Sequence, residues 1–321
     1  MTSFWNDYPG MPEALERVSG VIRSSAASQN PIISEGLNTL FSGDGKLLRP
    51  GLLLLAAHFG KLKDKHYKLA AAIEMLHMAT LIHDDVIDDS PLRRGLPSLH
   101  TRFGKRDAVL IGDFLLSRSF VLVAEHTSPQ NTLYLAQLMT TICAMEIEQN
   151  NDRFSNNISL RSYLRKIMGK SALMFSLACY SGAQEAKASR LVCQRLRRAG
   201  LNIGLAFQII DDILDYTGKE DLVRKPLEND ISVGLITLPL ICAIKQEKNG
   251  KLREIFSQKS FKPEQAKTIY TLVREAGGIE AAQKYAESYT SRALREINAL
   301  PSGKNRDMFL NLTVQLLNRK M

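Results

Sequence analysis

The sequence predicts an all-α protein, folded as one large helical bundle across residues 1–321. Three observations carry this prediction. Long segments have apolar residues at three- and four-residue spacing, which is the period of a helix that buries one face. No segment shows the convincing apolar–polar alternation of a half-buried strand. Prolines and glycines fall mostly between the periodic segments, at positions that end helices.

Six segments show the helical period most clearly. They span residues 47–60, 66–87, 107–125, 132–150, 160–182 and 186–215. The stretches near 70–82 and 201–214 are apolar on nearly every side, which is typical of a helix inside a bundle or at a subunit interface. Because no linker, low-complexity tract or short repeat interrupts the pattern, we expect a single domain of about ten to twelve helices.

The composition fits a globular protein with anionic partners. Hydrophobic residues make up 45% of the chain, enough for a substantial core, and the formal net charge is +9. Such a charge favours phosphorylated substrates, acidic membrane surfaces or nucleic acid, but the chain has no nucleic-acid-binding motif. The basic runs at residues 195–198 and 318–320 are interpreted as solvated helix faces, with a membrane or partner contact as the alternative.

The cysteines and the N-terminus indicate a cytoplasmic protein. Cys143, Cys179, Cys193 and Cys242 lie far apart in largely apolar surroundings, so we expect buried free thiols. The N-terminus has neither the basic nor the apolar region of a signal peptide. The longest aliphatic run, residues 52–57, is too short to span a bilayer.

Two aspartate clusters are the most informative feature. Residues 83–89 (HDDVIDD) and 208–215 (QIIDDILD) each contain Asp-Asp-x-x-Asp at the end of an apolar helix. Helix positions i and i+4 share a face with Cβ atoms about 5–6 Å apart, so Asp84 stands over Asp88 and Asp211 over Asp215. Two carboxylates this close repel by about 2–3 kcal/mol at an effective dielectric near 20.

Mg²⁺ relieves this repulsion. It takes one or two carboxylates and completes its octahedron with waters and phosphate oxygens. Two clusters facing each other across a cavity would hold a diphosphate between metal ions. The alternative is a pair of solvated acidic helix ends. With Asp at 16 of 321 positions, chance would give the pattern about 0.04 times per chain, and it occurs twice.

Basic residues in predicted loops complete a diphosphate site. Lys46 and Arg49 lie in residues 45–50 (GKLLRP), before a core helix, and Arg93 and Arg94 closely follow the first aspartate cluster. The planar fork of arginine matches phosphate oxygens, and lysine adds a point charge. Each motif alone is more often a surface loop, whereas beside the aspartate clusters both favour phosphate binding.

In combination, these motifs resemble the trans-isoprenyl diphosphate synthase family. The likeness runs in order from about residue 45 to residue 240, and residues 146–149 and 300–303 are similar to the catalytic component II of bacterial heptaprenyl diphosphate synthases. The segments that carry it are 45–50 (GKLLRP), 74–88 (EMLHMATLIHDDVID), 93–95 (RRG), 112–113 (GD), 207–215 (FQIIDDILD) and 237–240 (TLPL).

The resemblance implies an isoprenoid synthase bundle with a central substrate cavity, in which Mg²⁺ assists head-to-tail condensation of isopentenyl diphosphate with farnesyl or geranylgeranyl diphosphate. The allylic C–O bond ionises, the isopentenyl double bond attacks, and pyrophosphate removes the proton. The implied metal ligands are Asp84, Asp88, Asp211, Asp212 and Asp215. The implied catalytic residues are Asp84, Asp85, Asp88, Arg93, Lys170, Asp211 and Asp212. The implied allylic contacts are Arg93, Lys170, Ser171, Gln208 and Lys225, and those to isopentenyl diphosphate are Lys46, Arg49, His77 and Arg94.

The chain departs from the family pattern in places. Ser171 stands where the family often has threonine, and a hydroxyl is retained. Residues 224–230 (RKPLEND) replace a Gly-Lys-x-x-Gly-x-Asp pattern, and Leu235 stands where many members have a second lysine. From the residues alone, His77 is equally well a hydrogen-bonded core histidine, and Gln208 a helix-packing amide.

Product length is a steric question. Residues 68–89 contain no Phe, Tyr or Trp, and Ala79 and Thr80 precede Asp84 by one turn. Relatives that stop at farnesyl length carry bulky residues there, so the resemblance implies a longer product, with heptaprenyl as one candidate. The sequence does not identify the residue that closes the far end of the tunnel. Phe114 and Phe120 are candidates.

Several alternatives stay open at this level. A class I terpene cyclase would not need Lys46, Arg49 and Arg94, and usually lacks the second cluster. An HD-type phosphohydrolase, suggested by His77, His83 and Asp84, leaves the second cluster unexplained. A non-catalytic subunit has no reason to keep two repelling clusters. The resemblance leaves two assemblies, a homodimer or a heterodimer with a small regulatory subunit, and allows peripheral membrane contact for product release.

Overall fold

A computed structural model describes residues 3–41, 45–93, 95–151, 159–217, 236–257 and 263–317. Nearly all of these residues are helical, which confirms the all-α class. The strands in the described residues, β1 (Leu92–Arg93) and β2 (Leu96–Pro97), pair as a short antiparallel hairpin. The chain forms two compact units, residues 1–136 with 178–194 (unit 1) and residues 137–177 with 195–321 (unit 2). The expectation of one domain over residues 1–321 stays a prediction.

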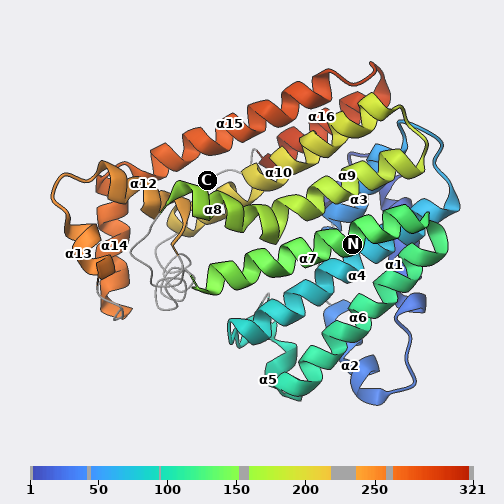
Figure 1. Cartoon of the computed structure of the whole chain (residues 1–321), viewed down its shortest axis with the longest axis horizontal. Helices are drawn as coiled ribbons and strands as arrows, with labels where there is room; N and C mark the ends of the chain where they lie inside the picture. Colours follow the sequence, from blue (N-terminus) through green and yellow to red (C-terminus); the bar gives the residue numbers. More distant parts are fainter. Residues whose placement is uncertain are drawn as a thin grey trace. The chain divides into compact units, whose positions relative to one another are not determined.

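Unit 1 is built around α4, which packs most extensively against α6 (Figure 1). The middle of α4 is buried on almost all sides, as its all-round apolar sequence predicts. The elements of unit 1 are η1 (Ser3–Trp5), α1 (Met11–Ser25), α2 (Pro31–Phe41), α3 (Leu48–Ala57), α4 (Asp64–Ile87), the hairpin, α5 (Leu99–Phe103), α6 (Lys105–His126), the start of α7 (Pro129–Asn151), the end of α9 (Leu173–Glu185) and the start of α10 (Arg190–Thr217).

Helix α3 is buried along most of its length, and a glycine sets how closely α9 approaches it. A Cβ atom at Gly182 would lie 2.2 Å from the carbonyl oxygen of Leu53. Any side chain at this position would therefore push the two helices apart. The contact holds α3 against the core of unit 1, immediately after the loop that carries Lys46 and Arg49.

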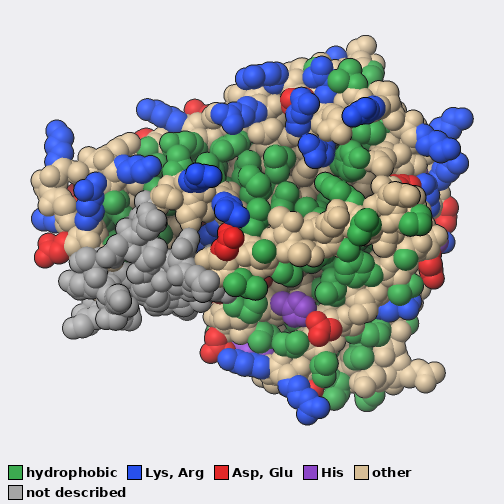
Figure 2. All heavy atoms as spheres, in the orientation of Figure 1, with side chains coloured by type: hydrophobic (Ala, Val, Ile, Leu, Met, Phe, Trp, Pro, Cys, Tyr) green, Lys and Arg blue, Asp and Glu red, His purple; other side chains and the backbone are tan. Residues whose placement is uncertain are grey.

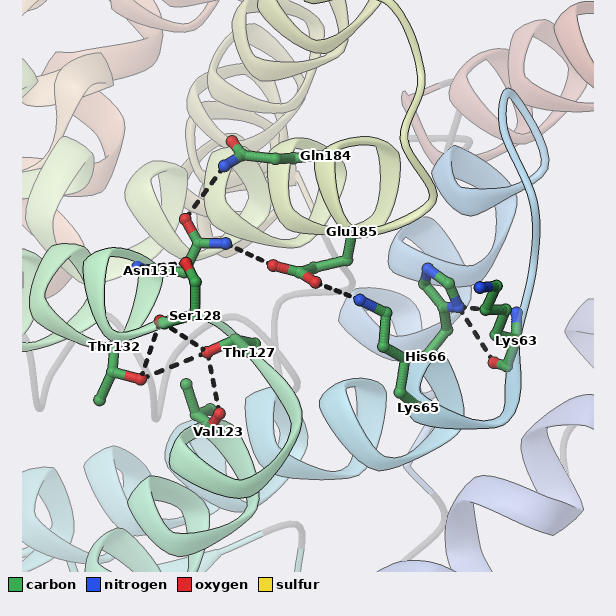
Figure 3. A network of polar contacts seen from close by, with 10 residues as sticks. All are labelled: Lys63, Lys65, His66, Val123, Thr127, Ser128, Asn131, Thr132, Gln184 and Glu185. Atoms are coloured by element: carbon green, nitrogen blue, oxygen red, sulfur yellow. Dashed lines mark hydrogen bonds and ion pairs between the residues drawn. The ribbon is translucent and has the colours of Figure 1, made fainter.

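A network of polar side chains fixes the start of α4 (Figure 3). Lys65 forms an ion pair with Glu185, which also accepts a hydrogen bond from the Asn131 amide. Gln184 Nε2 donates to Asn131 Oδ1 at 3.0 Å. His66, which is fully buried, accepts the backbone N–H of Lys63 at Nδ1 (2.8 Å). These contacts join the beginning of α4 to the start of α7 and the end of α9.

The buried His66 makes the stability of the protein depend on pH. Burial lowers the pKa of His66 and the charge of Lys65 acts in the same direction, while the backbone of Lys63 and, less strongly, Glu185 oppose them. Because Nδ1 accepts the backbone N–H of Lys63, the neutral ring carries its proton on Nε2, and the whole side chain is buried. A charged ring would therefore be held in a site that solvates it poorly.

We expect the free energy of unfolding to fall as the pH drops below about 6.5, where the unfolded histidine gains a proton and the folded one does not. The loss continues until the pH reaches the lowered pKa of the folded state. Thermal melts of wild type and His66→Asn, between pH 8 and 5, test this. The variant should lose less stability than wild type over that range, and parallel profiles would contradict the prediction.

Unit 2 gathers its helices around two hydrophobic clusters. Its central helix α12 is buried on all sides from Leu238 to Ile244 and packs most extensively against α15. The elements of unit 2 are the rest of α7, α8 (Leu160–Ile167), a π-helical turn η2 (Met168–Ala172), the start of α9, the rest of α10, α12 (Leu238–Gln246), α13 (Lys251–Ser257), α14 (Pro263–Glu275), α15 (Gly278–Asn298) and α16 (Lys304–Leu317).

The structure corrects two details of the sequence-based expectations. The predicted helix over residues 160–182 contains the π-helical turn at Met168–Ala172, which no periodicity argument shows. Cys143 is exposed rather than buried, because it lies on an outward face of α7, while the other three cysteines are buried as expected. In the basic run at 195–198, the Nη1 atoms of Arg195 and Arg198 each lie 3.5 Å from a carboxylate oxygen of Glu296 and form ion pairs with it.

Candidate active site

The first aspartate cluster ends α4 in unit 1. The carbonyl of Asp84 accepts the backbone N–H of Asp88 at 2.8 Å, so these two residues stand one helical turn apart on one face. Both are partly buried. The helix ends at Ile87 with Asp88 as its C-cap, and Asp89 takes a left-handed conformation (φ 51°) and pairs with Lys105 at 2.9 Å. The predicted pairing of Asp84 with Asp88 on one face is therefore present.

Asp85, the second aspartate of this cluster, is buried and paired with an arginine. Asp85 is buried, with 7% of its surface exposed, and it accepts hydrogen bonds from Arg93. Arg93 Nε lies 3.0 Å from both carboxylate oxygens, and Nη2 lies 2.5 Å from Oδ1. The β1–β2 hairpin returns Arg93 to α4 only eight residues after Asp85. Two of the predicted catalytic residues are thus brought together, as an ion pair.

A cavity of about 350 Å³ lies beside this ion pair, inside unit 1. Its polar lining residues include Glu74, His77, Asp85 and Arg93, as well as Ser19, Arg23, Thr39 and Ser98, and the rest of the lining is largely apolar. The walls include Ile22, Leu40, Phe41, Met78, Leu81, Ile82, Leu96 and Leu99, and Gly45 and Leu47 reach it from the predicted phosphate loop. The cavity therefore joins three sequence motifs, and Glu74 is a polar lining residue to which the sequence assigned no role.

The N-terminal segment supports the loop that carries Lys46 and Arg49. Trp5 is buried and donates its indole N–H to the carbonyl of Lys46 at 2.6 Å. A Cβ atom at Gly51 would lie 2.2 Å from the Trp5 ring, so glycine is required there. Lys46 Nζ lies 5.5 Å from the ring centroid of Phe4. Nothing in the local sequence of residues 45–50 indicated that Trp5 holds this loop.

The second aspartate cluster lies near the end of α10, in unit 2. Asp211 and Asp215 are partly buried and share a face, as predicted, whereas Asp212 is buried with 7% exposed. The hydroxyl of Tyr163 donates to Asp212 Oδ2 at 2.6 Å, and Gln208 Nε2 donates to Oδ1 at 3.0 Å. In both clusters, the second aspartate is therefore directed into the protein.

Gln208 also links the cluster to the π-helical turn. Its amide oxygen accepts a hydrogen bond from the hydroxyl of Ser171 at 2.6 Å. Burial raises the pKa of Asp212, which the hydrogen bonds from Tyr163 and Gln208 and the charges of Lys166 and Lys170 oppose. Lys170 is thus close enough to act on the cluster electrostatically. Single π-helical turns are rare and often mark functional sites.

The donor set suits a metal ion that is bound together with a phosphate-bearing ligand. Within the described ranges, no group of three or more His, Cys, Asp or Glu side chains is arranged to hold a metal ion alone. Mg²⁺ usually takes only one or two protein carboxylates and obtains its other ligands from water and substrate phosphates. The pairs Asp84/Asp88 and Asp211/Asp215 each offer two, which fits this mode of binding.

Some predicted residues cannot be located. Arg94, Lys225, the segment 224–230 and Leu235 lie outside the described residues. The two aspartate clusters belong to different units, so their meeting across one cavity stays a prediction. None of the helices in the described part of the chain combines the length and hydropathy needed to cross a membrane.

Comparisons with known proteins identify the family. The model of the family described as "Polyprenyl synthetase" matches residues 30–273. Component 2 of heptaprenyl diphosphate synthase from Bacillus subtilis (strain 168) is 34% identical over 316 residues, which cover 98% of this chain and 90% of that protein.

Solved structures agree along nearly the whole chain. Geranylgeranyl pyrophosphate synthase from Lactobacillus brevis ATCC 367 gives a TM-score of 0.91 at 36% identity, covering 99% of both chains. Polyprenyl synthase from Caulobacter crescentus CB15, complexed with calcium and isoprenyl diphosphate, gives 0.89 at 31% identity, covering 97% of this chain and 96% of that one. With its two aspartate clusters, this chain belongs to the polyprenyl synthetase family and is a prenyltransferase.

Proposed function

We propose that this prenyltransferase condenses isopentenyl diphosphate with an allylic diphosphate in the presence of Mg²⁺, in the cytoplasm, and makes a product longer than farnesyl diphosphate. The proposal rests on the cavity in unit 1, which is lined by the Asp85–Arg93 ion pair, by His77 and by many apolar side chains. The cationic and polar side chains of this lining suit a diphosphate, and its apolar side chains suit an isoprenoid tail.

In this proposal, the aspartates bind metal ions, and the basic and polar residues bind the two diphosphates. Asp84, Asp88, Asp211 and Asp215 hold divalent metal, with Asp212 as a further candidate, and bound Mg²⁺ would stabilise the negative charge of the departing diphosphate. The related Caulobacter protein contains calcium and isoprenyl diphosphate. Arg93, Lys170, Ser171, Gln208 and Lys225 contact the allylic diphosphate, and Lys46, Arg49, His77 and Arg94 bind isopentenyl diphosphate. No side-chain nucleophile is needed.

The walls of the cavity support a long product. Met78, Leu81 and Ile82 of α4 line it, and α4 has no Phe, Tyr or Trp from residue 68 to its end. A growing tail therefore meets aliphatic side chains and the adaptable Met78 along this helix, without a bulky Phe, Tyr or Trp to stop it. The relatives compared above are named for heptaprenyl and geranylgeranyl products, both longer than farnesyl. Seven isoprene units is the length we propose.

Incubating the purified chain with Mg²⁺, farnesyl diphosphate and labelled isopentenyl diphosphate, and then sizing the extracted lipid, tests the proposal. We expect products longer than farnesyl, formed only with metal. Condensation that stops at farnesyl from a shorter primer would contradict the product length. Product that forms only after a small unlike subunit is added would identify this chain as the catalytic half of a heterodimer. A cyclic hydrocarbon in place of a longer diphosphate would indicate a terpene cyclase.

We further propose that unit 1 contacts a second copy of this chain through α6 and the start of α7. Val109, Leu110 and Val121 on α6 and Leu133 and Tyr134 on α7 are exposed hydrophobic side chains. Figure 2 shows hydrophobic surface over these two helices. Leu110 is 54% and Leu133 59% exposed, which is costly for a monomer and usual for an interface.

Sedimentation velocity measures this directly. Wild type should sediment as a dimer, Leu110→Glu should shift it towards monomer, and Leu191→Glu should not, although Leu191 is equally apolar and 63% exposed. A wild-type monomer would contradict the homodimer and leave the unlike subunit as the occupant of this face.

A further inference from the structure

We infer that Tyr163 is a positioning residue of the second aspartate cluster, acting through Asp212 on the neighbouring carboxylates. The inference rests on the proposed metal-binding role of Asp211 and Asp215. It assigns a role to a tyrosine that lies 49 residues from its partner in the sequence and belongs to none of the motifs discussed above.

The contact between the two side chains is short and shielded from water. The Tyr163 hydroxyl lies 2.6 Å from Asp212 Oδ2, with 4% of the tyrosine and 7% of the aspartate exposed. Hydrogen bonds to a charged acceptor are stronger than neutral ones. A buried carboxylate oxygen that loses its donor regains no equivalent partner from bulk water. Tyr163 therefore restricts the orientation of the Asp212 carboxylate.

The contact is part of a chain of four side chains. Ser171 donates to Gln208, and Gln208 and Tyr163 each donate to one oxygen of Asp212. The chain thereby joins α8, the π-helical turn and α10. Because both carboxylate oxygens of Asp212 are hydrogen-bonded, the rotation of α10 about its axis is fixed at this residue. Asp211 directly precedes it, and Asp215 follows it by three positions.

Packing of the Tyr163 ring in the hydrophobic core holds its hydroxyl group in place. Tyr163 belongs to the larger hydrophobic cluster of unit 2, together with Ile167, Ile209 and Ile213. A phenylalanine at this position would keep the ring packing and delete only the hydroxyl. Groups that orient metal ligands from behind typically alter metal affinity by about 10- to 100-fold when they are removed. Tyr163→Phe is therefore a selective test of positioning.

The experiment compares wild type, Tyr163→Phe and Tyr285→Phe. Tyr285 packs against the same cluster and is the matched control for a tyrosine-to-phenylalanine change. We expect Tyr163→Phe to raise the Mg²⁺ concentration for half-maximal activity by about 10-fold or more, with a smaller change in kcat at saturating Mg²⁺. Mn²⁺ binding, followed by electron paramagnetic resonance with inorganic diphosphate present, should weaken by a similar factor. Tyr285→Phe should match wild type in both assays.

The outcomes distinguish a failure of this inference from a failure of the proposed function. Unchanged Mn²⁺ affinity in a folded Tyr163→Phe protein, when wild type binds Mn²⁺ with diphosphate, overturns the role of Tyr163 alone. A wild type that binds no Mn²⁺ with diphosphate overturns both this inference and the proposed function. If circular dichroism shows that Tyr163→Phe does not fold, Tyr163→Met, which also removes the hydroxyl and leaves an apolar side chain in the cluster, replaces it. That variant must then show the same loss of Mn²⁺ affinity, and wild-type affinity would overturn the inference.

Discussion

Asp84→Asn and Asp211→Asn are each expected to lower kcat by at least 10²- to 10³-fold, the loss typical when one strong electrostatic stabiliser of a transition state is removed. Each change keeps the shape of the side chain and removes one negative charge from a pair one helical turn apart. The remaining carboxylate binds Mg²⁺ less tightly, and the departing diphosphate loses its charge stabilisation. Steady-state kinetics with farnesyl and isopentenyl diphosphates at saturating Mg²⁺ measures the effect.

A neighbouring aspartate provides the control. Asp89 directly follows the first cluster, is paired with Lys105 and lies outside the Asp-Asp-x-x-Asp pattern. Its left-handed backbone (φ 51°) also suits asparagine. We expect Asp89→Asn to keep kcat within a few-fold of wild type. Circular dichroism should show wild-type helicity in all three variants. Near-normal turnover of Asp84→Asn or Asp211→Asn would contradict the proposed metal sites.

Arg93→Met should lower kcat/KM by about 10²- to 10³-fold and should also destabilise the protein. The methionine keeps much of the side-chain length, but it leaves Asp85, a buried carboxylate, without its bidentate donor. Leaving such a group unsatisfied costs about 1–3 kcal/mol. Arg93→Lys should recover little of the activity, because an ammonium group cannot reproduce the planar fork. Kinetics and urea denaturation report the two effects separately.

A double-mutant cycle with Asp85→Asn separates the ion pair from the contact with substrate. Arg93→Met in the Asp85→Asn background should cost less stability than Arg93→Met alone, because no buried charge is then left unpaired. Activity should stay low in the double variant, since the cation proposed to meet the allylic diphosphate is still missing. Additive losses of stability would show that Arg93 and Asp85 are not coupled.

The sequence predicted the parts of the site that depend on local geometry. Helical period alone places Asp84 over Asp88 and Asp211 over Asp215, and the all-round apolar sequence of α4 predicts its burial. The short link from Asp85 to Arg93 makes their meeting accessible to sequence reasoning as well, although the ion pair itself was not foreseen. In each case the relevant residues lie within a few turns of each other.

Contacts between distant segments were missed, because they depend on how helices pack. Tyr163 looks like an ordinary core residue of an amphipathic helix, and its bond to Asp212 exists only when α8 lies against α10. Trp5 likewise meets Lys46 only in the folded unit 1. The π-helical turn adds one residue to a helical turn. Residues 160–182 contain so many apolar side chains that their pattern fits a helix with or without this extra residue.

A crystal structure of the protein with Mg²⁺ and inorganic diphosphate would show whether the two aspartate pairs share one ligand. We expect oxygens of the Asp84/Asp88 pair and of the Asp211/Asp215 pair to lie about 2.0–2.1 Å from Mg²⁺ ions, with one diphosphate bridging the ions of both pairs. Metal ions bound at only one pair, or at two sites that no single diphosphate joins, would contradict this expectation.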